Sequence, residues 1–149
     1  MTPRRALHRM RELELLQRVE RDVAAIDVGE AQARETAAVE AAERDADRVL
    51  ALARTWDAAI GSDRFLPEMV SAIGAALLDA DTTAERAALV ARDMASVREA
   101  HTDHWRRLDA TMRATGDVAR GLARDAARLD EEAALAAVAE RATFDWRRR

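Results

Sequence analysis

Apolar residues recur along the second half of the chain at spacings that alternate between four and three residues. This alternation is the heptad pattern of a coiled coil, which places every apolar residue on one side of a helix. The pattern runs from Leu66 to Ala136, with polar residues on it only at Arg98, His101 and Thr115. A single surface helix rarely keeps such a pattern for this long. The second half is therefore predicted to be a long helix that packs against another long helix.

The first half of the chain carries two shorter runs with the same spacing. The first run is Leu16, Val19, Val23, Ile26, Glu30, Ala33 and Ala37, and the second is Val39, Ala42, Ala46, Val49, Ala53, Trp56 and Ile60. The two runs are offset by one residue, so the helix interface is expected to shift between them. Pro3 is tolerated in a first helical turn. These runs predict one helix over about residues 4–60.

Helix-breaking residues cluster at two places. Gly61–Pro67 is the stronger break, and Asp79–Thr83 is a weaker one, where Thr82-Thr-Ala-Glu85 has the form of a capping box. These breaks predict a turn and a short helix over 61–82, with the short helix at 67–80, followed by a second long helix over about 83–144. At 1.5 Å per residue the long helices would span roughly 85 and 90 Å. The predicted fold is all-α: one domain, 1–149, forming a long antiparallel two-helix coiled-coil hairpin with a short helix near the turn.

Composition favours the same architecture. The 149 residues include 36 alanines, about half of the 49% that are hydrophobic, and small side chains suit close helix–helix contacts better than a thick core. The net charge of −4 argues against a general nucleic-acid binder. The longest uncharged run, Met69–Leu78, is too short to cross a membrane. No nucleic-acid partner and no membrane-spanning helix are expected.

The two ends of such a hairpin would differ in character. Limbs of equal length would bring Arg4, Arg5, Arg9 and Arg11 near Arg147–Arg149, while the turn end would hold Trp56, Phe65 and Met69. A basic end and an apolar end suggest a connector between two partners. Two simpler interpretations remain open: the arginines are solvated, and the apolar residues close the hairpin's own core. Trp105 is expected in the core, whereas Trp146 fits a partner contact and simple exposure equally well.

No group of residues predicts catalysis. His101 and His104 lie three residues apart, but a metal site needs further ligands that the sequence does not place beside them. The glycines form no phosphate-binding motif, and the chain has no cysteine. A two-helix rod also offers no cleft in which carboxylates would be desolvated. We expect no enzymatic activity, no metal and no cofactor.

Three segments resemble a known family. They are Phe65-Leu-Pro-Glu-Met-Val-Ser-Ala-Ile73 after the helix break, Arg98-Glu-Ala-His-Thr-Asp-His-Trp-Arg-Arg-Leu108, and Leu129-Asp-Glu-Glu-Ala-Ala134 before an arginine-rich end. Their order, the length and the helical hairpin pattern resemble the FliJ/YscO family of flagellar and injectisome type III export. The resemblance implies a stalk-like coupling protein that links a hexameric export ATPase to the export-gate membrane protein and escorts export chaperones. It also implies a cytoplasmic protein held at the inner face of the cell membrane.

The resemblance also implies contact residues. Matched to the family's gate-binding strip, the second-half members are Phe65, Met69 and Ala72, and the first-half members are Val49, Leu52 and Trp56. For the ATPase the family gives only a region, and within it Arg4, Arg5, Arg9 and Arg11 are the candidates, since a basic helix end complements an acidic ring lumen. The alternative is a generic coiled-coil adaptor or chaperone for helical partners. A rod that binds membranes or nucleic acid through its arginines is a weaker alternative, disfavoured by the net charge.

Overall fold

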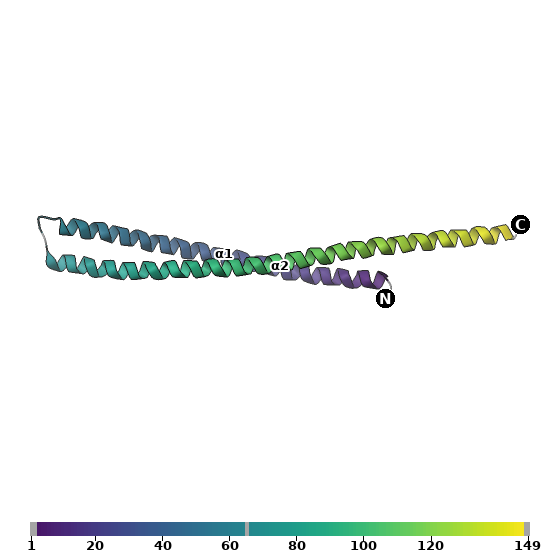
Figure 1. The fold of residues 1–149 in the computed structure, drawn as a ribbon, viewed down its shortest axis with the longest axis horizontal. Helices are drawn as coiled ribbons and strands as arrows, with labels where there is room; N and C mark the ends of the chain where they lie inside the picture. Colours follow the sequence, from purple (N-terminus) through teal and green to yellow (C-terminus); the bar gives the residue numbers. More distant parts are fainter. Residues whose placement is uncertain (1–2, 65, 148–149) are drawn as a thin grey trace. The chain divides into compact units, whose positions relative to one another are not determined.

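The computed structural model describes the backbone of residues 3–64 and 66–147, which form two helices joined by a turn (Figure 1). Helix α1 spans Pro3–Ile60 and helix α2 spans Pro67–Arg147. No strand occurs within these two described ranges. The prediction of an all-α chain with two long helices is therefore confirmed.

The turn lies where the sequence predicts it. Helix α1 ends at Ile60, after which the Gly61 amide donates a hydrogen bond of 3.0 Å to the Asp57 carbonyl. Within the turn, the Ser62 hydroxyl oxygen accepts a bond of 3.2 Å from the Arg64 amide. Pro67 is the first residue of α2, a position at which the backbone N–H has no partner within the helix, so its absence costs nothing. The negative charge of Glu68 in the first turn interacts favourably with the positive end of the helix dipole. Phe65 lies outside the described residues.

Helix α2 has no break at Asp79–Thr83, and the predicted short helix is wrong. Residues 67–82 belong to the same continuous helix of 81 residues as the predicted second long helix. The hydroxyls of Thr82 and Thr83 donate to the carbonyls of Leu78 and Asp79, each at 2.9 Å. A threonine that bonds back to the carbonyl four residues earlier fits inside a helix as well as at its start, which is why the capping-box pattern misled the prediction.

The chain divides into two compact units, each of which contains segments of both helices. Unit 2 is Ala24–His104, with the turn between its two helical arms (Figure 1). Glu35 there pairs with Arg98, and Trp56 lies against Gly74, so later residues of α1 meet earlier residues of α2. Unit 1 is Met1–Val23 with Trp105–Arg149. There Arg4 pairs with Asp130, and Arg21 lies near Asp109, again in antiparallel order.

The interface predicted on α2 is confirmed over most of its length. Every predicted position from Val70 to Ala126 is buried or half-buried, including Trp105. Two of the three polar positions have hydrogen-bond partners: Arg98 donates to Glu35, and the buried Thr115 hydroxyl donates to the Thr111 carbonyl at 3.0 Å. The third, His101, is half-buried. The heptad pattern therefore identifies the correct face of α2 in both units.

The interface predicted for the first part of α1 is wrong. Leu16, Val19, Val23 and Ile26 are more than half exposed, and Glu30, Ala33 and Ala37 are exposed as well. The face toward α2 instead carries small or polar residues: Glu14, Gln17, Arg21, Ala24, Ala31, Glu35 and Ala38. Ala24 and Ala31 are only 3% and 2% exposed. The α2 interface carries the bulkier Met94, Trp105, Leu108 and Met112, all half-buried, so α1 contributes small side chains to its inward face and α2 larger ones, and small side chains let packed helices approach closely.

Glu35 and Arg98 form an ion pair inside the unit 2 interface. The Arg98 Nε donates to the Glu35 carboxylate at 2.5 Å. The Glu35 side chain is 21% exposed and the Arg98 side chain 37%. We expect a double-mutant cycle of Glu35→Ala and Arg98→Ala to give a coupling energy of about 1 kcal/mol. Solvent around the partly exposed side chains screens the charges and keeps this energy small. Urea unfolding followed by circular dichroism measures it. The exposed pair Arg34–Glu30 on α1 is the matched control, with an expected coupling of at most about 0.5 kcal/mol. Equal couplings would contradict a specific role for the interface pair.

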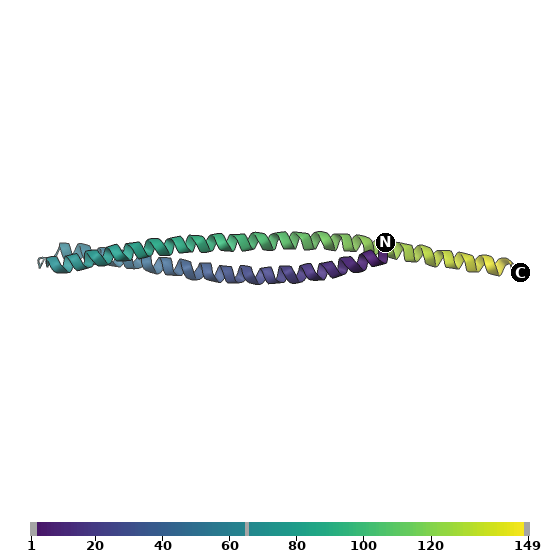
Figure 2. The ribbon, with the colours of Figure 1, turned by 90° about the horizontal axis from the view of Figure 1, so that it is seen from below.

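Helix α2 continues beyond the start of α1 in unit 1, so the predicted meeting of the two termini is wrong. Arg4, in the first turn of α1, pairs with Asp130, and α2 runs on from there to Arg147, about 25 Å further along its axis (Figure 1; Figure 2). We call residues 131–147 the α2 extension. Because the absent break lengthens α2, the two helices have 81 and 58 residues instead of the predicted similar lengths. Arg148 and Arg149 lie outside the described residues.

Candidate partner-binding surfaces

The four predicted ATPase-binding arginines lie close together at the start of α1. The side chains of Arg4, Arg5, Arg9 and Arg11 are all exposed. Arg4 forms an ion pair of 2.5 Å with Asp130 of the same chain. This first stretch of α1 carries no carboxylate before Glu12, which in turn lies 3.2 Å from the His8 imidazole. The start of α1 in unit 1 is thus a locally basic surface on an acidic protein.

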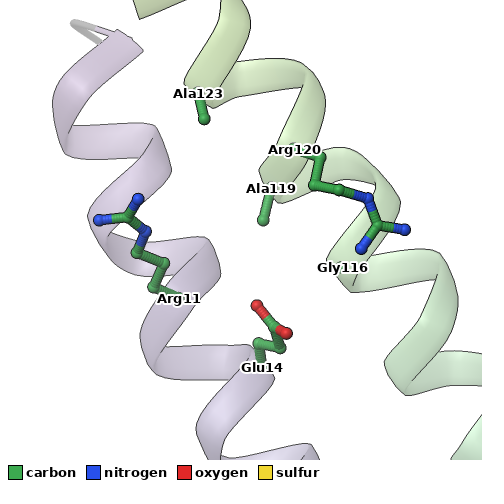
Figure 3. A pocket seen from close by; sticks show the side chains of 6 residues that line it. All are labelled: Arg11, Glu14, Gly116, Ala119, Arg120 and Ala123. Atoms are coloured by element: carbon green, nitrogen blue, oxygen red, sulfur yellow. The ribbon is translucent and has the colours of Figure 1, made fainter.

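Arg11 also borders a small pocket between the two helices of unit 1 (Figure 3). Its lining consists of Arg11 and Glu14 from α1 with Gly116, Ala119, Arg120 and Ala123 from α2. The Glu14 carboxylate points into the space between the helices, toward Gly116 and Ala119 (Figure 3). A methyl group added at Gly116 would lie in ordinary contact with the Arg120 guanidinium at 3.5 Å and with a Glu14 carboxylate oxygen at 3.7 Å, so both side chains border this position. The pocket therefore places one carboxylate between two arginines and offers no enclosed apolar cavity.

A cluster of charged side chains around Arg21 also lies between the two helices of unit 1. The side chain of Arg21 bonds to Asp22 at 2.5 Å and lies 3.8 Å from Asp109, whose other carboxylate oxygen accepts from Arg113 at 2.6 Å. The hydrogen bond to Asp22 raises the pKa of the Arg21 guanidinium above its usual value; the charges of Asp22 and Asp109 act in the same direction, and desolvation opposes them. Arg21 is thus a permanent cation at an interface position of α1.

The predicted gate-binding residues differ in their exposure. Val49, Leu52 and Trp56 are half-buried, at the same periodic positions of α1 that pack on α2. Trp56 lies so close to Gly74 that a methyl group added there would meet its ring carbons at 2.5 and 2.9 Å. Met69 is 43% exposed and Ala72 is exposed, while their neighbours Val70 and Ile73 pack inward. Hence the structure brings the first three residues into the helix interface and leaves the last two at the surface.

A group of large aliphatic side chains on α1 faces outward, although three of them, Leu16, Val19 and Val23, are predicted at the interface. Leu15, Leu16, Val19 and Val23 are 59%, 64%, 62% and 52% exposed, and their spacing places them on a single face of α1 in unit 1. We call these four residues the outer stripe. The opposite, inward face carries Glu14, Gln17 and Arg21, and the buried amide oxygen of Gln17 accepts no hydrogen bond from the described residues. This part of α1 thus exposes its large aliphatic side chains and turns polar ones toward α2.

The remaining candidate chemistry is sparse in the part of the chain that the structure describes. His101 and His104 line a surface groove with Val97 and Ala100, and no group of three or more potential metal ligands occurs among the described residues. Neither described helix contains a stretch apolar enough to span a membrane. No known family model matches the sequence, and no curated protein or solved structure is significantly similar to it.

Proposed function

We propose that the protein is a non-enzymatic, stalk-like coupling component of a type III protein export apparatus. In this role it links the export ATPase hexamer to the export-gate membrane protein and escorts export chaperones at the inner face of the membrane. Support comes from the order of the three sequence segments that resemble the FliJ/YscO family and from the long helices that carry them. The observation that carries the proposal is the exposed basic start of α1, a surface complementary to an acidic ring lumen.

The test is ATP hydrolysis by a purified hexameric type III export ATPase, with and without the protein. We expect the protein to raise hydrolysis. The triple variant Arg5→Glu, Arg9→Glu, Arg11→Glu should need about tenfold more protein for the same effect, because charge reversal removes the attraction that guides encounter. Arg4 is left unchanged to keep its pair with Asp130.

Arg48→Glu with Arg54→Glu is the matched control, since both arginines are exposed on α1 in unit 2. This variant should act like the unaltered protein. No change in hydrolysis with the unaltered protein would reject the stalk proposal. An equal loss in both variants would reject the basic start of α1 as the contact surface.

A generic coiled-coil adaptor for helical partners is the second candidate. The outer stripe favours it, because large aliphatic side chains on the outward face of a helix are the usual anchors for another helix. An adaptor would bind amphipathic helices and leave the ATPase rate unchanged, so the same assay separates the two candidates.

A further inference from the structure

Unit 1 contains a second apolar face that the chain itself does not cover. On the α2 extension, Leu135, Val138, Ala142 and Trp146 recur at spacings of three and four residues and so share one face of the helix. Leu135 is 70% exposed, Val138 66% and Trp146 82%, and Ala142 is exposed as well. The extension and the outer stripe of α1 are thus two apolar helix faces of similar length within the same unit.

The extension cannot cover the outer stripe of its own chain. Asp130 pairs with Arg4 in the first turn of α1, and the extension continues from that point away from α1 as part of one unbroken helix (Figure 1; Figure 2). The outer stripe lies in the other direction along α1, further from its start. An extension that lies on the stripe must therefore come from another molecule.

The charges of the two segments match when they lie side by side in the same direction. Helix α1 begins with arginines and carries Glu20 and Asp22 further on, beside the outer stripe. The extension begins with two carboxylates, Glu131 and Glu132. The later charges of the extension, Glu140, Arg141, Asp145 and Arg147, cancel one another, so the orientation depends on Glu131 and Glu132. A parallel alignment sets these two carboxylates beside the arginines at the start of α1, whereas the reversed alignment would set them near Glu20 and Asp22. The sequence order therefore favours a single orientation.

The combined area is adequate for a stable complex. The exposed aliphatic side chains of the stripe and extension, with the Trp146 indole, present on the order of 500 Å² of apolar surface per chain. Since protein interfaces are a little over half apolar, this corresponds to about 900 Å² per partner, close to the roughly 800 Å² of a standard interface. Either face alone would fall well short of that area. The standard interface area is reached only when the arrangement is reciprocal, so that each chain contributes both its stripe and its extension to the contact.

We propose that two copies of the chain form a two-fold symmetric dimer through unit 1, in which the α2 extension of each copy lies along the outer stripe of the other. This dimer does not rest on the export-stalk function, although the partner's extension would approach the same arginines at the start of α1, and it is measured on the isolated chain without an ATPase. A failure of one proposal leaves the other intact.

Sedimentation equilibrium of the full chain tests the dimer. We expect a mass of twice the 16.5 kDa of one chain. Val19→Glu and Val138→Glu should each weaken the self-association at least about tenfold, because each buries a charge in one of the two faces. Helicity should stay unchanged, since both positions are exposed within the chain. Leu78→Glu is the matched control: Leu78 is 72% exposed in unit 2 and should leave the dimer intact.

Disulfide trapping tests the orientation of the two chains. Because the sequence contains no cysteine, only the introduced cysteines can form disulfides. When Val19→Cys and Ala142→Cys chains are mixed and oxidised, we expect a disulfide that joins the two variants. A disulfide between two Val19→Cys chains would instead show stripe packed on stripe and would overturn the proposal. A monomer at all accessible concentrations, or a dimer that both glutamate variants leave intact, would overturn it as well.

Discussion

Gly74→Ala is expected to destabilise the protein by about 1–2 kcal/mol, although alanine normally stabilises a helix by about 0.5–1 kcal/mol over glycine. The reason is Trp56, whose ring carbons would lie 2.5 and 2.9 Å from the new methyl group. Real methyl contacts are not that short, so the indole or the helix backbone must move, and overpacking of this kind costs about 1–3 kcal/mol. Urea unfolding followed by circular dichroism measures the change in the free energy of unfolding.

Gly29→Ala is the matched control for this prediction. Gly29 also lies in a helix of unit 2, but nothing stands within 4 Å of the position of its added methyl group. We expect Gly29→Ala to stabilise the protein by about 0.5–1 kcal/mol. In a Trp56→Ala background, Gly74→Ala should also become stabilising. If Gly74→Ala stabilised the unaltered protein, Trp56 would not pack on Gly74.

The contrast between the two helices shows what the sequence pattern could predict. On α2, bulky residues such as Met94, Trp105 and Leu108 recur in one unbroken phase, so the correct face could be found from the sequence. On α1, alanine occurs on nearly every face, for example at Ala24, Ala25 and Ala33, and the hydrophobic pattern loses its power to discriminate. The prediction then followed the largest aliphatic residues, whereas the structure packs the smallest ones against α2.

The candidate surfaces were predictable only in part. The arginines at the start of α1 follow from the sequence alone, since consecutive turns of a helix keep them together. The contact of Trp56 with Gly74 depends on which residues of the two helices face each other, and that register is not encoded in either helix separately. How far α2 continues past the start of α1 depends on the same register. It was also mispredicted because the sequence alone does not tell whether Thr82 and Thr83 begin a new helix or lie within a continuous one. Phe65 remains a prediction from the family resemblance.

Ala31→Leu is expected to destabilise the protein by about 1–3 kcal/mol. Ala31 is the most buried of the core alanines in the described residues, at 2% exposed, and lies on the face of α1 that packs on α2 in unit 2. Three extra carbon atoms at that position would push the two helices apart, because the distance between packed helices is set by the side chains at their contact. The nearby Glu35–Arg98 pair, four residues further along α1, should weaken as the helices separate. Thermal unfolding by circular dichroism measures the loss.

Ala33→Leu separates the observed interface from the one that the heptad pattern predicts. Ala33 lies on the predicted interface but is exposed in the structure, so leucine there should change the free energy of unfolding by less than about 0.5 kcal/mol. Both substitutions add the same atoms to the same helix two residues apart, and leucine and alanine are both good helix formers, so differences in helix propensity cancel. The two variants therefore differ only in the direction that the added side chain faces. If Ala33→Leu were the more disruptive of the two, the part of α1 in unit 2 would pack on α2 through the face that the heptad pattern predicts.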